Sequence, residues 1–317
     1  MTEQNRAEMN RFSKTNTPFI ALLSYDEPKK DIVCEISEAK KRGLKFKFDA
    51  KFKSKISYKL KKFPLKFKIY HKAFKKVQDA MKNGDCELLN LCFPTPFKSD
   101  LELKEIYRYS SAALKIMLKN SFVCFTPEIF VEIENGVIKT FPMKGTIDAK
   151  IKNAKEKLLN DKKEFDEQMM VTKLMQNDLS AVASSVEIKK FRYFSEIKTQ
   201  KGKILQTSSE ICGILNEHYL QNFGDLFEKI LPAGSISGAP KDKTCEIIRK
   251  NELVKRGFYS GVFVYFDGKI LRSFVMIRFV QKISKNKFRF FSGGGITLKS
   301  KAKKEFDELN KKAYFTF

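Results

Sequence analysis

The 317-residue sequence has no tryptophan and only two histidines, His71 and His218. Neither histidine has the spacing of metal ligands, which argues against a zinc site and against Ser-His-Asp or Cys-His-Glu hydrolase chemistry. The six cysteines form no Cys-x-x-Cys pair and lie in or beside apolar segments, as buried thiols of a reducing compartment do. No apolar run reaches the length of a membrane span, and residues 1–14 lack the apolar core of a signal peptide. These absences predict a cytoplasmic protein.

Acidic residues are also in short supply, since 37 Asp and Glu stand against 62 Lys and Arg, a formal net charge of +25. A nucleic-acid-binding protein typically gathers such charge in a basic tail, an arginine-rich block or a known motif. Here single lysines alternate with phenylalanines along the chain, as in residues 45–48. We therefore predict no nucleic-acid function, and we expect the charge to favour a small dianionic substrate.

The order of local patterns indicates the fold class. Strand and helix patterns are mixed, and two-residue hairpin turns are signalled by Asn135-Gly136 and Asp267-Gly268. This order favours an α+β fold with antiparallel sheets over a doubly wound parallel fold. The chain shows no repeat, no low-complexity linker and no clear boundary, so residues 1–317 are predicted to form a single domain.

The expected elements follow from apolar periodicity. Strands are predicted at 18–25, 44–52, 56–60, 88–93, 122–125, 129–133, 137–141, 186–194, 257–266, 269–281 and 287–296. Helices are predicted at 71–82, 101–118, 153–179, 208–221, 241–254 and 299–314. Residues 1–15 are expected to be a loose tail, and Pro94 and Pro96 are expected to lie in a loop because proline cannot donate to a strand ladder.

The stretch 137–146 contains a candidate nucleophile. An alternating strand ends at Pro142, and Gly145 permits a sharp turn. Lys144 stands between them, with Met143 and Gly145 as neighbours and no adjacent carboxylate. A lysine attacks only when neutral, a state that burial or nearby cations favour. A solvated lysine in a turn is the other interpretation of the same pattern.

Paired glutamates at helical spacing form a second candidate feature. Glu164 and Glu167 are three residues apart, as are Glu305 and Glu308, so each pair shares a helix face, and Lys312 lies one turn beyond the second pair. Glutamates that face each other across a site can hold Mg²⁺, which prefers carboxylate oxygens and keeps several waters. The spacing alone is equally typical of an ordinary charged helix surface.

Two glycine-rich stretches can bind an anion through backbone N–H groups. Residues 293–295 follow a strand, and residues 233–241 lead into a helix N-terminus. The second stretch is not a P-loop because the Gly-Lys-Ser/Thr ending is missing, and either stretch can also be a simple turn. Arg278 lies in an apolar strand pattern, where an arginine needs a carboxylate partner from the protein or from a substrate.

Taken together and in order, these segments resemble the chorismate-utilising enzymes, the family of anthranilate synthase, aminodeoxychorismate synthase and the isochorismate and salicylate synthases. The segments that carry the resemblance are Gly84-Asp85, Leu89-Asn90-Leu91, residues 126–130, residues 142–146, Glu164/Glu167, residues 176–179, residues 232–241, residues 257–261, Ile277-Arg278, residues 293–296 and Glu305/Glu308. Residues 1–80 match only weakly. The resemblance implies two antiparallel β-sheets packed as a sandwich, with helices on the outside.

Lysine in the motif Pro-x-Lys-Gly-Thr is typical of aminodeoxychorismate synthase component I within this family, whereas anthranilate synthases carry alanine there. The resemblance therefore implies conversion of chorismate and ammonia to 4-amino-4-deoxychorismate, for 4-aminobenzoate and folate synthesis. Anthranilate synthase or isochorismate synthase activity is the alternative within the family, and a non-catalytic basic binding protein is the alternative from another class. Asp148, Thr172-Lys173 and Gln206 depart from common family residues, so the fine substrate contacts stay open.

The same resemblance implies a role for each site residue. Lys144 is the nucleophile, and Glu128 is the general acid and later the base. Mg²⁺ is held by Glu167 and Glu308, with Glu164 and Glu305 acting directly or through water. The residues implied to bind substrate are Tyr259, Arg278, Gly294, Gly295, Ser235, Lys312 and Thr146. Because the chain has no plausible glutaminase triad, a separate glutamine amidotransferase subunit is the implied source of ammonia.

Overall fold

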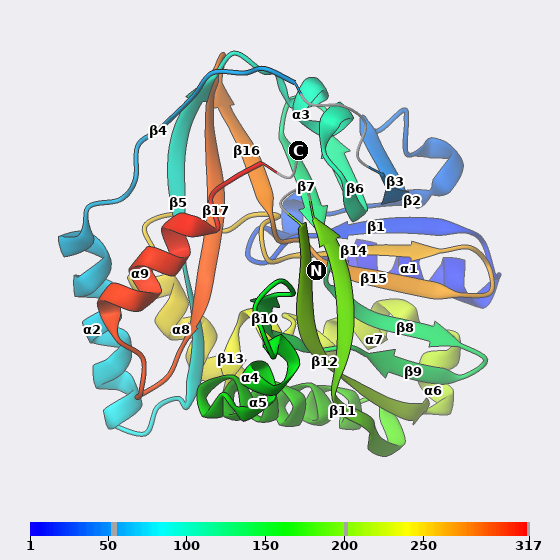
Figure 1. Ribbon diagram of the computed structural model, residues 1–317. Coiled ribbons are helices and arrows are strands. Elements are labelled where there is room, and N and C mark those ends of the chain that lie inside the picture. The colour runs from blue at the N-terminus through cyan, green and yellow to red at the C-terminus, as the bar shows by residue number, and fades with distance from the viewer. Residues whose placement is uncertain (52–55, 200–201, 316–317) are drawn as a thin grey trace.

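The computed structural model describes residues 1–51, 56–199 and 202–315, and their strands form two antiparallel sheets surrounded by helices (Figure 1). The first sheet has the spatial order β10-β12-β9-β8-β15-β14-β1-β2, and β11 pairs with β12. Its strands are β1 (Phe19–Leu23), β2 (Ile32–Glu35), β8 (Ile129–Glu134), β9 (Val137–Thr140), β10 (Met143–Asp148), β11 (Ala183–Thr199), β12 (Gly202–Leu215), β14 (Val262–Phe266) and β15 (Leu271–Val275).

The second sheet has the spatial order β13-β5-β17-β16-β7-β6-β3, and β4 pairs with β5. Its strands are β3 (Leu44–Ala50), β4 (Leu60–Lys62), β5 (Leu88–Ser99), β6 (Ala112–Leu118), β7 (Phe122–Thr126), β13 (Gly238–Ala239), β16 (Phe279–Ser284) and β17 (Lys287–Ile296). Apolar side chains of both sheets meet in a shared core, as Ile20 and Phe263 of the first do with Ile116 and Phe291 of the second. The predicted α+β class with two antiparallel sheets is confirmed.

Helices lie around the outside of the two sheets (Figure 1). They are α1 (Glu3–Lys14), α2 (Phe67–Lys82), α3 (Leu103–Tyr109), α4 (Ala154–Asn160), α5 (Lys162–Ser180), α6 (Glu217–Leu220), α7 (Phe223–Ile230), α8 (Lys241–Asn251) and α9 (Ala302–Lys311), with the 3₁₀ turns η1 (Pro28–Lys30), η2 (Ile36–Glu38) and η3 (Gly234–Ile236). Helix α5 packs against β10, β11 and β12 of the first sheet, and α9 packs against β5 and β17 of the second. None of the helices in the described segments is long and apolar enough to span a membrane.

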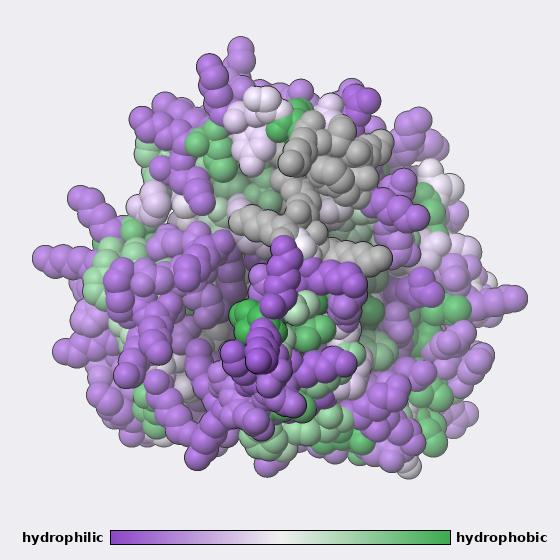
Figure 2. All heavy atoms as spheres, viewed as in Figure 1, coloured by the Kyte–Doolittle hydropathy of each residue, from purple (hydrophilic) through white to green (hydrophobic). Residues whose placement is uncertain are grey.

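Both predicted hairpins form, but only the first has the predicted two-residue turn. Asn135 and Gly136 have φ angles of 50° and 74° and close the β8–β9 hairpin. In the β14–β15 hairpin, residues 267–270 lie between the last paired residues, Phe266 and Leu271, and Asp267 Oδ1 accepts hydrogen bonds from two backbone N–H groups of this loop. Hydrophilic residues cover the viewed face over both halves of the molecule (Figure 2), as expected from lysines spread along the sequence.

The N-terminal tail prediction is wrong, because residues 3–14 form helix α1. Thr2 caps the helix, with its side-chain oxygen accepting a hydrogen bond from Asn5 N at 3.2 Å. Met9 and Phe12 are buried, and Phe12 stacks on Phe19 of β1 with ring centroids 5.5 Å apart. Burial of this apolar pair fixes a segment that otherwise has a polar composition.

The loop predicted at Pro94 and Pro96 is also wrong, because β5 continues through both prolines. Pro96 O accepts a hydrogen bond from Phe63 N at 2.8 Å, so the N and O atoms of Pro96 face away from β17. Pro94 lies two residues away and has the same orientation. Neither missing N–H therefore removes a bond from the β5–β17 ladder.

Two predicted helices are largely strands. Of residues 101–118 only Leu103–Tyr109 are helical, and residues 112–118 form β6 between β3 and β7. Of residues 208–221 only a short α6 is helical, and residues 208–215 belong to β12. Strand β12 pairs with β9, β10 and β11. Pairing with strands distant in the sequence overrides the local helical pattern at both places.

The remaining differences concern element bounds. The strand predicted at 269–281 divides into β15 of the first sheet and β16 of the second, and Asp161 separates α4 from α5 within the helix predicted at 153–179. Helix α2 begins one turn earlier than predicted, and α9 is shorter at both ends. Of the strand predicted at 56–60 only Leu60 lies in a strand, and residue 52 lies outside the described residues.

Candidate active site

A small pocket lies where β10 of the first sheet approaches β5, β17 and the η3 turn. It is lined by Leu88, Asn90, Lys144, Gly234, Ser235, Gly238 and Gly295. A Cβ atom on Gly295 would lie 3.9 Å from Lys144 Nζ and 3.2 Å from Leu88 Cδ1, so glycine leaves room beside the amine. The structure therefore brings together three predicted site residues, Lys144, Ser235 and Gly295, from three separate parts of the sequence.

Lys144 lies inside strand β10 and not, as the sequence predicted, beyond the end of a strand. The pairing of β10 with β12 shifts between Lys144 and Thr146, and Gly145 within this irregularity has a φ of 76°. Such a bulge redirects the side chains beside it. A Cβ atom on Gly145 would lie 3.1 Å from Glu164 Oε2, so glycine also permits close approach of β10 to α5. The bulge therefore lies where β10 approaches α5, and Lys144 beside it lines the pocket.

The segment before Lys144 is held by buried polar groups that the sequence analysis missed. Gln168 of α5 is fully buried, and its Nε2 donates to Pro142 O at 3.0 Å and to Ser209 Oγ at 2.9 Å. Ser209 N also donates to Pro142 O, at 2.9 Å. These bonds fix the entry of β10. The only signal for these bonds in the sequence was the four-residue spacing of Gln168 from Glu164, which places both on one face of a helix.

Glu128 lies between β7 and β8 and faces the η3 turn. Ser235 Oγ donates a hydrogen bond to Glu128 Oε1 at 2.7 Å. Burial raises the pKa of Glu128, and the Ser235 hydrogen bond and the charges of Lys144, Lys312 and Arg278 oppose this rise without cancelling it. A carboxyl group with a raised pKa keeps its proton to higher pH, as a general acid requires.

The four predicted metal-binding glutamates converge from two helices. Glu164 and Glu167 come from α5, and Glu305 and Glu308 come from α9. Burial raises the pKa of Glu164, and the charge of Glu167 raises it further. Burial likewise raises the pKa of Glu305, and Lys163 opposes this rise. Because these carboxyl groups lie close together and are partly buried, ionising all of them at the same time is unfavourable.

Lys312 connects this acidic group to the glycine-rich strand. Its Nζ donates to Gly293 O at 2.9 Å and lies 2.8 Å from Glu308 Oε1. Although burial acts to raise the pKa of Glu308, the Lys312 charge and hydrogen bond hold it below its ordinary value. A Cβ atom on Gly294 would lie 3.6 Å from Glu305 Oε2, so β17 passes close to α9.

The chemistry of these side chains fits Mg²⁺, since four carboxylates, of which only Glu305 is buried, match its preference for oxygen ligands and water. In the structure these carboxylates are arranged as an ion-pair cluster around the ammonium group of Lys163. Lys163 Nζ lies 3.3 Å from Glu167 Oε1 and 3.7 Å from Glu305 Oε1. Across the described segments of the chain, no three His, Cys, Asp or Glu side chains are close enough to hold a metal ion.

Three residues predicted to contact substrate, Tyr259, Arg278 and Thr146, are not among the residues that line the pocket. Tyr259 is 4% exposed, stacks on Phe291 with centroids 4.9 Å apart, and directs its hydroxyl to Cys92 Sγ at 3.7 Å. Arg278 is half-buried in the crossover between β15 and β16, with a φ of 53°, and not in a strand as predicted. Thr146 is exposed on β10. Their substrate roles stay predictions.

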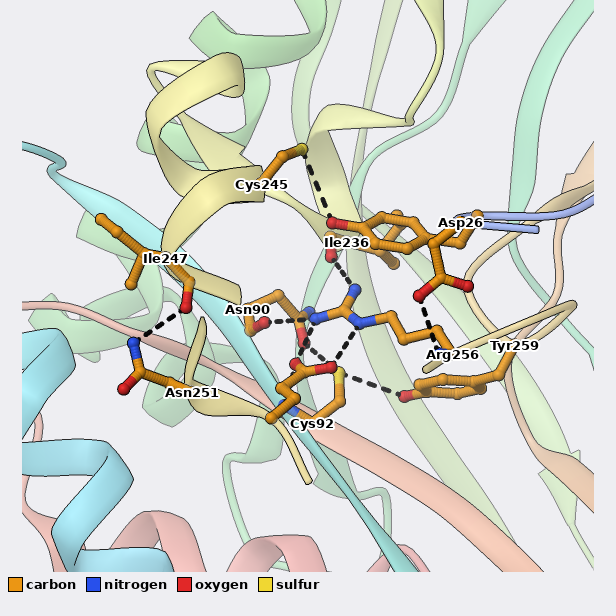
Figure 3. A network of polar contacts seen from close by, with 11 residues as sticks. Asp26, Asn90, Cys92, Ile236, Cys245, Ile247, Asn251, Arg256 and Tyr259 are labelled. Atoms are coloured by element: carbon orange, nitrogen blue, oxygen red, sulfur yellow. Dashed lines mark hydrogen bonds and ion pairs between the residues drawn. The ribbon is translucent and has the colours of Figure 1, made fainter. Parts of the chain in front are cut away.

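A buried network on the other side of the pocket was not foreseen (Figure 3). The Arg256 side chain is 1% exposed, and its Nη2 lies 2.6 Å from Glu252 Oε1. Its Nη1 donates to Ile236 O at 2.8 Å and its Nη2 to Asn90 O at 2.7 Å, while Glu252 Oε1 accepts from Cys92 N at 2.8 Å. The network ties η3, which carries Ser235, to β5. The four-residue spacing of Glu252 and Arg256 was its signal in the sequence.

Comparison with known proteins identifies the class to which this chain belongs. Residues 8–317 match the family model described as chorismate binding enzyme, so the chain belongs to the family of chorismate-binding enzymes. Solved structures show the same fold at low sequence identity. The menaquinone-specific isochorismate synthase of Escherichia coli superposes with a TM-score of 0.70 at 15% identity, covering 96% of this chain and 78% of that one.

Anthranilate synthase component I of Streptococcus pneumoniae superposes with a TM-score of 0.65 at 22% identity, covering 84% of this chain and 60% of that one. Among curated sequences, an uncharacterised PabA-like protein of Haemophilus influenzae is 45% identical over 312 residues, 97% of this chain and 94% of that protein. Aminodeoxychorismate synthase component 1 of Escherichia coli is 30% identical over 254 residues, 75% of this chain and 54% of that protein.

Proposed function

We propose that this member of the family converts chorismate and ammonia to 4-amino-4-deoxychorismate and water. The observation that carries the proposal is the position of Lys144 in the pocket, beside Gly295 and Ser235, with its charge acting on both Glu128 and Glu308. The 30% identity to aminodeoxychorismate synthase component 1 of Escherichia coli supports the same assignment.

In the proposed first step, Glu128 donates a proton to the 4-hydroxyl of chorismate, which leaves as water. Lys144 first loses its ammonium proton to solvent, and its neutral amine then forms a bond to C2 as the C4–O bond breaks and both ring double bonds shift. In the second step ammonia attacks C4, both double bonds return to their first positions and the C2–N bond to Lys144 breaks, which releases the neutral amine. Glu128, now ionised, accepts the proton that the added ammonia gives up. The enzyme is thereby restored.

The residues around Lys144 and Glu128 have positioning roles in this scheme. Ser235 holds the Glu128 carboxyl group through its 2.7 Å hydrogen bond. Tyr259, Arg278, Lys312, Thr146 and the backbone at Gly294 and Gly295 are proposed to hold the substrate carboxylates. Mg²⁺, when bound by Glu167 and Glu308 with help from Glu164 and Glu305, would neutralise negative charge on the ring carboxylate.

The ammonia is proposed to come from a separate glutamine amidotransferase subunit. Of the two histidines, His71 lies on α2, and His218 on α6 has its Nε2 2.9 Å from Asp225 Oδ2. All six cysteines are free, and five of them are buried. This arrangement offers no accessible Cys-His pair within the described chain. We expect the isolated protein to use ammonium salts and not glutamine.

The test is a product assay with chorismate, Mg²⁺ and ammonium, coupled to an aminodeoxychorismate lyase. The proposal predicts 4-aminobenzoate only when the lyase is present. Anthranilate or isochorismate as the main product would instead assign this chain to another branch of the family. Failure of any product to form, together with tight nucleic-acid binding that weakens steeply with salt, would support a basic binding protein.

A substitution at the nucleophile separates the covalent scheme from direct attack by ammonia. Lys144→Ala is expected to reduce turnover by about 10³-fold or more, since it removes the attacking group. Intact-protein mass spectrometry after chorismate treatment without ammonia should show an adduct on the parent protein and none on Lys144→Ala. Lys139→Ala, on strand β9 of the same stretch, is the matched control. Unchanged turnover of Lys144→Ala would reject the nucleophile.

A further inference from the structure

The acidic group of α5 and α9 already contains a cation of the protein itself. Lys163 precedes Glu164 on α5, and its Nζ lies 3.3 Å from Glu167 Oε1 on the same helix and 3.7 Å from Glu305 Oε1 on α9. Both distances are those of ion pairs, so one ammonium joins a carboxylate of α5 to a carboxylate of α9.

The geometry around Lys163 also explains why the carboxylates do not form a ready metal site. Mg²⁺ requires oxygens at about 2.0–2.1 Å in octahedral geometry, whereas Glu167 and Glu305 are spread around an ammonium at 3.3 and 3.7 Å. A divalent ion on the same oxygens would repel the lysine. The Lys163 side chain is 54% exposed, so it can swing into solvent without leaving a buried charge behind.

We propose that Lys163 is the resident counter-ion of this site, and that a divalent cation binds by displacing it. In the metal-free protein Lys163 holds the carboxylates of α5 and α9 together. On metal binding it releases Glu167 and Glu305, and this exchange lowers the apparent affinity for the metal. The inference rests on the proposed Mg²⁺ site. Lys312 and Lys144 also act electrostatically on this cluster, through Glu308, but Lys163 alone of the three pairs with carboxylates of both helices.

Calorimetric titration of chelator-treated protein with Mg²⁺ tests the exchange without an activity assay. Lys163→Met keeps the length of the side chain and removes its charge. We expect this variant to bind Mg²⁺ on the order of tenfold more tightly, because the competing charge is gone. Its melting temperature in chelator is expected to fall by about 2–4 °C and to recover when Mg²⁺ is added.

Two further variants make the comparison specific. Lys299→Met removes a lysine from the segment before α9 whose Nζ lies 3.0 Å from Asp166 on α5, so it also links these two parts of the chain but pairs with none of the four glutamates. We expect its Mg²⁺ affinity to stay within about twofold of the parent, as for an exposed screened charge. Lys163→Arg keeps the charge and should likewise bind about as the parent does.

The possible outcomes separate this inference from the proposed function. Tighter binding by Lys163→Met alone supports displacement. Equal or weaker binding by Lys163→Met, with clear binding by the parent, overturns the counter-ion role and leaves the metal site intact. Absence of Mg²⁺ binding by the parent and by Lys163→Met rejects the metal site and this inference together, while the product assay still decides on the reaction.

Discussion

Two groups of charged side chains near the candidate pocket, here named its walls, are built on different physical principles. One is the Arg256 network, made of Asn90, Cys92, Ile236, Glu252 and Arg256, in which the guanidinium is buried and hydrogen-bonded to three partners. The other is the acidic wall, made of Glu164, Glu167, Glu305 and Glu308. There burial and mutual repulsion raise the pKa of Glu164 and Glu305, and exposed Lys163 supplies a compensating charge.

This difference indicates which part of the site is preorganised. A buried ion pair with its hydrogen bonds satisfied has a fixed geometry, and removal of one partner leaves an uncompensated charge. Clustered carboxylates near solvent are instead held apart by their own repulsion until a cation joins them. The Arg256 network therefore fixes in advance the η3 turn that carries Ser235, the hydrogen-bond partner of Glu128. The acidic wall, under the proposed function, reaches its working arrangement only with a bound cation.

The largest effect is expected from breaking the preorganised wall. Arg256→Met should lower the free energy of unfolding by about 3–5 kcal/mol, because Glu252 is left buried without its partner. Urea denaturation followed by circular dichroism measures this loss. The double variant Arg256→Met/Glu252→Leu should recover part of it, since both charges are then absent. A loss below about 1 kcal/mol for the single variant would show that the network does not hold this wall together.

The sequence predicts a wall well when its interactions join residues close in the sequence, and poorly when they join distant segments. Glu164 and Glu167 were recognisable because helical spacing is a local property. The Glu252–Arg256 pair has the same kind of local spacing, but its importance comes from Ile236 O and Asn90 O, backbone atoms that carry no sequence signal. The network became visible only once the fold had brought η3 beside β5.

The same limit applies to the fold. The hairpins at Asn135-Gly136 and Asp267-Gly268 were predicted at the right places because a turn depends on its own residues, although the second has a longer loop than predicted. Strand β12 was mistaken in part for a helix because its identity depends on β9, β10 and β11, which lie elsewhere in the sequence. The position of Lys144 depends both on local sequence and on pairing with a distant strand. The motif singled out the residue, but the bulge in the β10–β12 pairing placed its side chain.

A smaller effect is expected at Ser235, which lies on the η3 turn held by the Arg256 network and bonds to the proposed general acid Glu128. Ser235→Ala removes the hydrogen bond to Glu128, a contact that opposes the rise in the pKa of Glu128. The pKa should therefore rise further, and the alkaline limb of the pH–rate profile, which reports loss of the general-acid proton, should move to higher pH. We expect turnover at pH 7 to change by less than about tenfold, because Glu128 itself remains.

Ser237→Ala is the matched control for Ser235→Ala. Ser237 lies two residues further along, and its hydroxyl donates to Ala233 O rather than to Glu128. The limbs of the pH–rate profile of Ser237→Ala should lie at the same pH as those of the parent, even if the variant is less stable. A Ser235→Ala limb that stays in place, or moves to lower pH, would show that Ser235 does not set the protonation of Glu128.

The smallest effect, and one of opposite sign, is expected in the acidic wall. Burial raises the pKa of Glu305, so the folded protein holds this proton more tightly than the unfolded chain. Its contribution to stability is then greatest below the unfolded pKa of about 4.3 and is lost as pH rises through the folded pKa. Glu305→Gln should therefore stabilise the metal-free protein at pH 7 by about 0.5 kcal/mol, a value kept small because the charge of Lys163 offsets much of the burial penalty.

Urea unfolding in chelator at pH 7 and at pH 4 measures this effect, which should be absent at the lower pH. Glu246→Gln is the control of opposite sign, because a hydrogen bond from Lys250 lowers the pKa of Glu246, so that variant should lose stability at pH 7. Addition of Mg²⁺ should reverse the order for Glu305→Gln, since a ligand of the cation is then missing. Destabilisation of the metal-free protein by Glu305→Gln would mean that the ion pair with Lys163 outweighs carboxylate repulsion, and that the acidic wall is preorganised in the same way as the Arg256 network.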